Sequence, residues 1–144
     1  MKKIVQKIVL AGFIVRSGKV LILQRGKEEE SYPNIWELPS GRKEPLESSE
    51  AALLREIKEE SGLDVRIICP FSVFNYQIEK EDEICDSTQI SFIVVPIVDG
   101  EAHVVLSSEH QAFAWISKEE IDRYDITDAT KEVMRRGFEI LPKI

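Results

Sequence analysis

The chain has 144 residues, a length that fits one domain with a sizeable hydrophobic core. Hydrophobic residues make up 43% and charged residues 31% of it, which excludes a disordered or collagen-like chain. The net charge of −7 argues against a nucleic acid polymer as partner, although a small phosphate ligand is compatible with it if metal ions supply positive charge.

The cysteines and the N-terminal segment bear on the cellular compartment. Cys69 and Cys85 have no C-x-x-C spacing, so we expect reduced thiols in the cytoplasm, with a single disulfide as the alternative. The apolar run 8–15 follows Lys7 and is too short to cross a membrane. We therefore expect a cytoplasmic protein without a membrane partner.

The first third of the chain predicts a strand hairpin followed by loops. Apolar residues on both sides of the turn 16–19 indicate two strands. The later segments are short, charged or proline-containing, which is typical of loops. In order, the predicted elements are a strand at 7–15, a strand at 20–24, a loop at 27–34, an extended piece at 36–39 and a loop at 40–47.

One helix is predicted in the middle of the chain, ending at Ser61. Ser48 or Ser49 can cap its N-terminus, and Glu50 lies in the first turn, where a negative charge is favourable. Gly62 supplies the left-handed backbone conformation that ends many helices.

The rest of the chain predicts further strands and two more helices. The segment 63–77 is rich in strand-forming residues but interrupted by Pro70, and the acidic segment 79–86 is predicted as a loop. In order, the remaining expectations are a strand at 89–97, a turn at Asp99-Gly100, strands at 102–106 and 113–116, a short helix opened by a capping box at 117–120, and a helix at 128–137 with Ala129, Val133 and Met134 inward. We expect an α/β fold with a mixed sheet between helices, in a single domain over residues 1–144.

The central helix has two specialised faces. At 100° per residue, Leu53, Leu54 and Ile57 fall on one arc, which suits burial. The opposite arc is charged, and a divalent cation between its carboxylates can remove their mutual repulsion. Taken alone, such an acidic face is most often simply solvated. The charged residues are Arg55, Glu56, Glu59 and Glu60.

The residues around this helix favour a metal site over a merely solvated acidic face. Residues 41–63 read GRKEPLESSEAALLREIKEESGL, which resembles the Nudix box position for position. So many fixed positions make the resemblance specific, and it implies a Nudix-type α/β/α sandwich with a mixed β-sheet, and a hydrolase acting on phosphoric anhydride bonds. The matching residues are Gly41, Glu47, Arg55, Glu56, Ile57, Glu59, Glu60, Gly62 and Leu63.

Two positions depart from the family pattern. Ser40 stands where members often have Gly, and its backbone carbonyl can still serve as a metal ligand. Leu46 also stands where Gly is common, so it can alter the loop or close down the pocket, which affects the choice of substrate more than the chemistry.

The resemblance implies the roles of the box residues. Glu56, Glu59 and Glu60 are expected to bind Mg²⁺, with Mn²⁺ as a possible substitute, so that phosphate charge is neutralised and water is activated for attack on phosphorus. Glu47 and Arg55 are expected to pair and to orient these carboxylates.

The general base is expected to be either Glu56 or an acidic residue from a later loop, for which Glu109 is the candidate. His110 is a second acid–base candidate, although a hydrogen-bonded loop histidine is the simpler interpretation.

Candidate substrate contacts are fewer and less specific. Arg25, Arg42 and Lys43 can contact phosphates, but isolated surface cations are common. Tyr76 can stack on a base, whereas Trp36 is expected to pack in the core.

Three functions follow from these observations. The favoured one is a MutT-like nucleoside triphosphate pyrophosphatase, within the wider class of enzymes that cleave a nucleoside diphosphate linked to another group. The alternative is an ADP-ribose or nucleotide-sugar pyrophosphatase. A Nudix domain that senses a nucleotide without cutting it is a different class, and the retained box glutamates argue against it. The expected partner is a small nucleotide-like phosphate. The resemblance is also compatible with a homodimer, because dimers are frequent among similar proteins.

Overall fold

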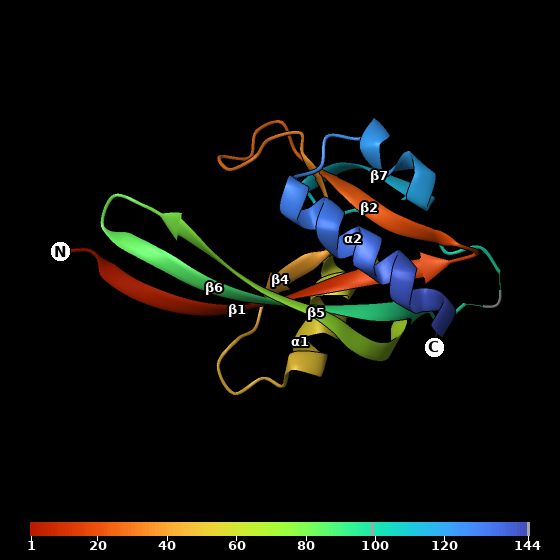
Figure 1. Cartoon of the computed structure of the whole chain (residues 1–144), viewed down its shortest axis with the longest axis horizontal. Coiled ribbons are helices and arrows are strands. Elements are labelled where there is room, and N and C mark those ends of the chain that lie inside the picture. Colours follow the sequence, from red (N-terminus) through yellow and green to blue (C-terminus); the bar gives the residue numbers. More distant parts are fainter. Residues whose placement is uncertain (99, 144) are drawn as a thin grey trace.

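Strands dominate the structure, and helices cover the sheet from two sides (Figure 1). The computed structural model describes residues 1–98 and 100–143. The elements in chain order are β1 (Lys3–Arg16), β2 (Lys19–Arg25), β3 (Trp36–Glu37), β4 (Ser40–Arg42), α1 (Ser49–Ser61), β5 (Val65–Glu79), β6 (Glu83–Pro96), β7 (His110–Ile116), the 3₁₀ helix η1 (Lys118–Arg123), α2 (Asp128–Ile140) and the 3₁₀ helix η2 (Leu141–Lys143). No helix in this described part is long and apolar enough to span a membrane.

The sheet is mixed and is organised around β1. Its main path runs β3-β2-β1-β6-β5, while β4 pairs with β1 and β7 with β2. The β1–β6 pair is parallel and runs from Lys3↔Glu83 to Ile14↔Val94, whereas the other strand pairs are antiparallel. In Figure 1, β1, β5 and β6 continue together as a long arm toward the N-terminus. The predicted α/β fold with a mixed sheet between helices is confirmed.

Two hydrophobic cores lie on opposite faces of the sheet because side chains alternate along β1. Leu10 and Ile14 pack with Leu53 and Ile57 of α1, whereas Phe13 packs in the core beneath α2. The predicted inward residues Val133 and Met134 of α2 are buried there.

Gly137 lies within α2, which continues beyond its predicted end. A side chain at Gly137 would place its Cβ 2.9 Å from Cε2 of Phe13, so this glycine permits close packing of the helix on the sheet. It was expected to end the helix, but α2 extends to Ile140. Two predicted inward residues, Ala129 and Leu54, are instead exposed.

The acidic segment 79–86 is part of a strand hairpin and not a loop. Glu79 ends β5 and pairs with Ile84 of β6, and the Lys80 N–H donates to the carbonyl of Glu83 at 2.8 Å. Glu79, Glu81 and Asp82 lie at the exposed tip, where charge is tolerated. Pro70 does not interrupt β5. It has no backbone N–H to donate, and the strand pairing accommodates this through register irregularities on both sides of it.

The expected strand at 102–106 is wrong for a different reason. This segment is assigned to no strand, although Ala102, Val104 and Leu106 pack against the core on the α1 side. The alternation in the sequence therefore reflects packing without strand pairing. The capping box at Ser117 opens the 3₁₀ helix η1, and Asp99 of the predicted turn lies outside the described residues.

Candidate active site

The acidic face of α1 is held in place by well-formed helix ends. Ser48 is the N-cap, and its side chain accepts a hydrogen bond from the Ala51 N–H at 3.1 Å. Gly62 ends the helix with φ 74°, and its N–H donates to the Lys58 carbonyl. Both predicted ends are confirmed, so the register of the carboxylates along the helix is fixed.

A tight turn precedes the helix and positions Glu47. The Glu47 N–H donates to the Glu44 carbonyl at 3.2 Å, and the second central residue of the turn, Leu46, has φ 67°. Glycine adopts this backbone conformation most easily, which explains why the family favours glycine at this position. The Leu46 side chain is fully exposed, so it does not close the pocket.

Arg55 connects this turn to the helix. Its Nε donates to Glu47 Oε2 at 2.8 Å and its Nη2 to Glu47 Oε1 at 2.9 Å, which makes a two-pronged contact. Its Nη1 donates to Glu56 Oε1 at 2.8 Å, and Glu59 Oε1 lies 3.6 Å away. The hydrogen bond from Arg55 lowers the pKa of Glu47 to about 2. The predicted contact between Glu47 and Arg55 is therefore present in the structure.

Gly41 lets the helix and β4 approach each other closely. A Cβ at this position would lie 2.0 Å from Cδ of Glu56, so any side chain would displace that carboxylate. The absence of a side chain at Gly41 therefore provides the space that Glu56 occupies. Burial raises the pKa of Glu56, although its hydrogen bond from Arg55 acts in the opposite direction.

Glu60 is the most deeply buried carboxylate of the helix face, with 6% of its surface exposed. Its Oε1 accepts a hydrogen bond from the Ser40 N–H at 2.9 Å. Burial, with smaller contributions from the nearby carboxylates of Glu37, Glu56 and Glu109, raises its pKa to about 9, although the hydrogen bond from Ser40 acts in the opposite direction. A buried group in this position requires either a proton or a cation.

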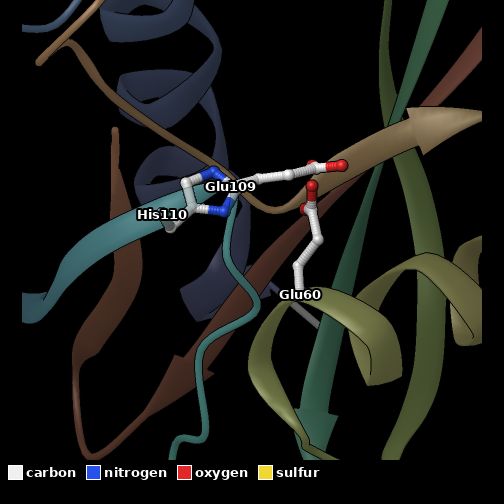
Figure 2. Close-up of side chains that lie close together, drawn as sticks. All are labelled: Glu60, Glu109 and His110. Atoms are coloured by element: carbon white, nitrogen blue, oxygen red, sulfur yellow. The ribbon is translucent and has the colours of Figure 1, made fainter. Parts of the chain in front are cut away.

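Glu109 and His110 approach Glu60 from the start of β7. Figure 2 shows the Glu109 and Glu60 carboxylates close together, with the His110 ring beside them. One potential ligand atom from each of these residues lies within 4.8 Å of the other two. The structure thus brings the predicted Glu109 to the box glutamates and adds His110.

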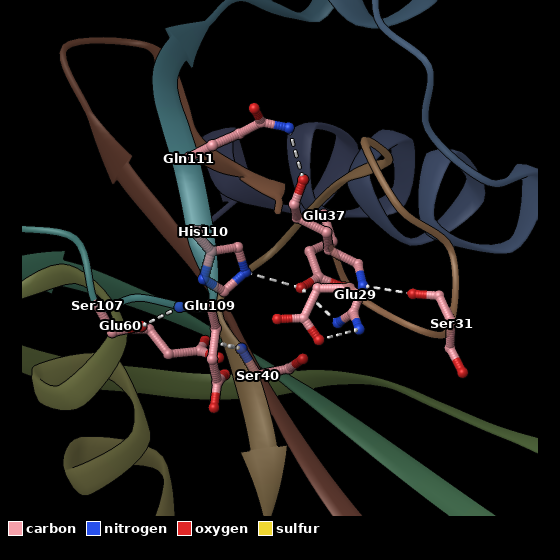
Figure 3. A network of polar contacts seen from close by, with 10 residues as sticks. Glu29, Ser31, Glu37, Ser40, Glu60, Ser107, Glu109, His110 and Gln111 are labelled. Carbon is pink, nitrogen blue, oxygen red and sulfur yellow. Dashed lines mark hydrogen bonds and ion pairs between the residues drawn. The ribbon is translucent and has the colours of Figure 1, made fainter. Parts of the chain in front are cut away.

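His110 belongs to a polar network that the sequence did not predict (Figure 3). Its Nε2 lies 2.9 Å from Glu37 Oε2, and Glu37 is also 3.4 Å from the Arg25 guanidinium. The ring is buried, and its Nδ1 has no hydrogen-bond partner within residues 1–98 and 100–143. The adjacency of His110 to Glu109 was its only signal in the sequence, because Glu37 is distant along the chain.

A cavity of about 470 Å³ opens next to Ser40. Of the predicted substrate contacts, Arg25 and Tyr76 line it, and Tyr76 lies beside Phe74 with ring centroids 5.6 Å apart. Trp36 packs edge-on against Tyr124, as expected for a core residue, and also lines the cavity.

The other two predicted substrate contacts lie elsewhere. Arg42 and Lys43 line a separate hollow beside residues 5–8 of β1. The Arg42 carbonyl accepts a hydrogen bond from Arg55 at 3.2 Å, so β4 is tied to the box network from this side. The side chain of Glu59 is 58% exposed.

The donor chemistry of this site suits a divalent cation. Several carboxylates converge on a partly buried region, while the nearby Arg55 guanidinium is already held by Glu47 and Glu56. Carboxylate oxygens are the preferred ligands of Mg²⁺ and Mn²⁺. The chain is thus an α/β protein with a cluster of acidic residues beside a cavity.

Comparison with known proteins gives the family. The model of the NUDIX domain matches residues 6–137, so the chain belongs to the Nudix family. The predictions of a MutT-like Nudix hydrolase and of an enzyme acting on phosphoric anhydride bonds are confirmed.

Individual proteins agree with this assignment. The nucleoside triphosphatase NudI of Enterobacter sp. (strain 638) is 28% identical over 131 residues, covering 88% of this chain and 92% of the relative. The solution structure of the E. coli ORF135 protein matches with a TM-score of 0.72 and 27% identity, covering 99% of this chain and 94% of that one. The crystal structure of MutT protein from Methanosarcina mazei Go1 matches with a TM-score of 0.76 and 25% identity, covering 99% and 98%.

Proposed function

We propose that this protein hydrolyses a nucleoside triphosphate at a phosphoric anhydride bond, with Mg²⁺ held by Glu56, Glu59, Glu60 and the Ser40 carbonyl. The observation that carries the proposal is the buried Glu60, which lies near other carboxylates and is hydrogen-bonded to Ser40, a residue that lines the cavity. The name of the NudI relative, a nucleoside triphosphatase, supports this substrate class.

The residues divide the work between binding and orientation. When bound, divalent ions supply positive charge for the phosphates and lower the pKa of water. Ser40 fixes the Glu60 carboxylate through its N–H, and Arg55 holds Glu56 against the preceding turn. These contacts pre-arrange the acidic site before substrate arrives, which reduces the cost of ordering it.

The proton acceptor is one of two carboxylates. Glu56 has one oxygen bonded to Arg55, whereas Glu109 lies near Glu60 and directly precedes β7. Comparison of the Glu56→Gln and Glu109→Gln variants by the pH dependence of kcat identifies the base, because its loss removes the acidic limb of the profile.

The cavity is proposed to bind the nucleoside. Tyr76 and Phe74 offer aromatic faces for a base, and Arg25 offers a cation near the same space. Arg42 and Lys43 lie at a different hollow, so we propose contact with an outer phosphate only for Arg25.

A hydrolysis screen with Mg²⁺ tests the substrate class. Nucleoside triphosphates, ADP-ribose and nucleotide sugars are compared by kcat/KM, and we expect the triphosphates to give the highest value with release of a nucleoside monophosphate. A higher value for ADP-ribose or a nucleotide sugar would select the alternative pyrophosphatase. Reaction in ¹⁸O-labelled water is expected to place the label on a phosphate product and never on a sugar carbon.

Three further expectations are retained as proposals. The free thiols of Cys69 and Cys85 support a reducing compartment such as the cytoplasm. A homodimer and the absence of a nucleic acid polymer as partner are open to direct measurement by light scattering and by binding assays.

A further inference from the structure

His110 has a side chain arrangement that hydrogen bonding within the protein does not explain. The carboxylate of Glu37 can only accept a hydrogen bond when ionised, so His110 Nε2, at 2.9 Å from it, is the donor. In the neutral ring this leaves Nδ1 with a lone pair. That atom is buried, the side chain being only 1% exposed, and it has no partner in the part of the chain that the structure describes.

The free ring nitrogen belongs to a residue that faces two carboxylates. Ligand atoms of Glu60, Glu109 and His110 lie within 4.8 Å of one another, and Figure 2 shows the three side chains converging from α1 and from the start of β7. A single ion with bonds of about 2.0–2.2 Å holds opposite ligands roughly 4.2 Å apart, so the separations of these three ligand atoms are close to those around one ion.

The partner of Nε2 is the one that metal-binding histidines usually have. Such a histidine almost always donates its other ring N–H to a carboxylate or carbonyl, which fixes the tautomer and the ring orientation. Glu37 occupies this position, and Arg25 contacts the same carboxylate oxygen at 3.4 Å (Figure 3). The contacts of Glu37 with Arg25 and with His110 Nε2 therefore fix the orientation of the His110 ring, and with it the direction of Nδ1.

We propose that His110 Nδ1 is a nitrogen ligand of a divalent ion shared with Glu60 and Glu109. A ligand set with one imidazole and two carboxylates gives Mn²⁺ or Co²⁺ an advantage over Mg²⁺, which prefers an all-oxygen shell. Assignment of Glu109 to the ion leaves Glu56 as the proton acceptor. The inference rests on the proposed function in one respect, because Glu60 is common to both metal sites.

Pulsed electron paramagnetic resonance of bound Mn²⁺ tests the proposal directly. The chain has two histidines, and His103 is exposed, so it provides a matched control. We expect a nitrogen hyperfine coupling in the wild type that changes with ¹⁵N-histidine labelling, persists in His103→Asn and disappears in His110→Gln. A spectrum of bound Mn²⁺ without nitrogen coupling, or a coupling that depends on His103, overturns the proposal.

Calorimetry measures the affinity for metal ions directly and does not depend on enzyme activity. We expect His110→Gln to lower the affinity for Mn²⁺ and Co²⁺ about 10–100-fold and that for Mg²⁺ by a smaller factor. Glu37→Gln keeps the imidazole and is expected to weaken Mn²⁺ binding in the same direction, which protects the test if His110→Gln does not fold. An equal loss for all three ions overturns the nitrogen-ligand proposal.

The two proposals fail in different ways. Mn²⁺ that binds without nitrogen coupling and is lost in Glu60→Gln overturns only the role of His110. A wild-type protein that binds no divalent ion overturns this inference together with the proposed function.

Discussion

The two sides of the candidate site balance their charges differently. On one side, Glu47 and Glu56 share the guanidinium of Arg55 through short hydrogen bonds. On the other, Glu60 is buried beside Glu109, and the described part of the chain places no guanidinium or ammonium group within 4.0 Å of the Glu60 carboxylate. The first side has its own cation, whereas the buried Glu60 has none and requires either a proton or a cation, so we centre the proposed metal site on Glu60.

Loss of Glu60 is expected to have the largest effect. Glu60→Gln keeps the size of the side chain but removes the charge that a cation requires, so we expect kcat/KM to fall by about 10³-fold or more. The control is Glu50→Gln in the exposed first turn of the same helix, which should retain activity. Full Mg²⁺-dependent activity of Glu60→Gln, with an unchanged circular dichroism spectrum, would contradict the metal assignment.

Loss of the Arg55 network is expected to have a smaller effect on activity. Glu47→Gln or Arg55→Gln releases the turn before the helix, and we expect each to lower kcat/KM about 10–100-fold. Because the residues act as one unit, the double variant should add little, with a coupling free energy of about 0.5–3 kcal/mol.

A double-mutant cycle measures this coupling in both kcat/KM and the free energy of unfolding. Strictly additive losses would show that the two residues act separately. In that case Arg55 would be reassigned to direct contact with a substrate phosphate.

The third prediction concerns the stability of the metal-free protein. The pKa of Glu60 is raised to about 9, so its stabilising protonated form is fully present below about pH 4.5 and is lost as pH rises toward 9. Glu60→Gln removes this titration. In EDTA at pH 8 we expect the variant to have a free energy of unfolding at least about 1 kcal/mol above that of the wild type, since one pKa unit corresponds to about 1.4 kcal/mol.

Urea unfolding at pH 5, 7 and 9 measures this difference, which should grow with pH. Added Mg²⁺ should stabilise the wild type more than the variant. If the free energies of unfolding of the two proteins changed with pH in parallel, burial would not disfavour the charged form of Glu60.

The smallest effect is expected in the turn before α1. Leu46 has φ 67°, which costs a non-glycine residue about 1–2 kcal/mol, while glycine loses about 0.5–1 kcal/mol of conformational freedom on folding. Leu46→Gly is therefore expected to raise the free energy of unfolding by up to about 1 kcal/mol with little change in kcat. A destabilised variant would show that the exposed leucine makes a stabilising contact, in solution or with a second chain.

Sequence reasoning was strongest where spacing along one element sets the geometry. The cap at Ser48 and the stop at Gly62 follow from residue type, and the shared face of Arg55 and Glu59 follows from helical periodicity. Prediction was weaker where tertiary packing decides the local structure. Segment 102–106, for example, alternates like a strand but pairs with no strand.

The contact of His110 with Glu37 could not be predicted for the same reason, although Glu60, Glu109 and His110 were each candidates. Glu37, Glu60 and His110 come from β3, α1 and β7, and only the folded sheet brings them together. No local pattern records that His110 is buried or that its Nε2 faces Glu37. The box identified half of the site, and the remaining half depends on contacts distant along the chain.

The parallel pairing of β1 with β6 has a consequence for how the protein folds. Residues 3–14 can join residues 83–94 only after the intervening chain, which includes the entire Nudix box, has been closed into a loop. The entropy of that closure precedes the gain from pairing, so we expect the central strand pair to form late and to set the folding rate. Helix α1 needs only local contacts to begin, and the acidic face can exist before the sheet that gives it its neighbours.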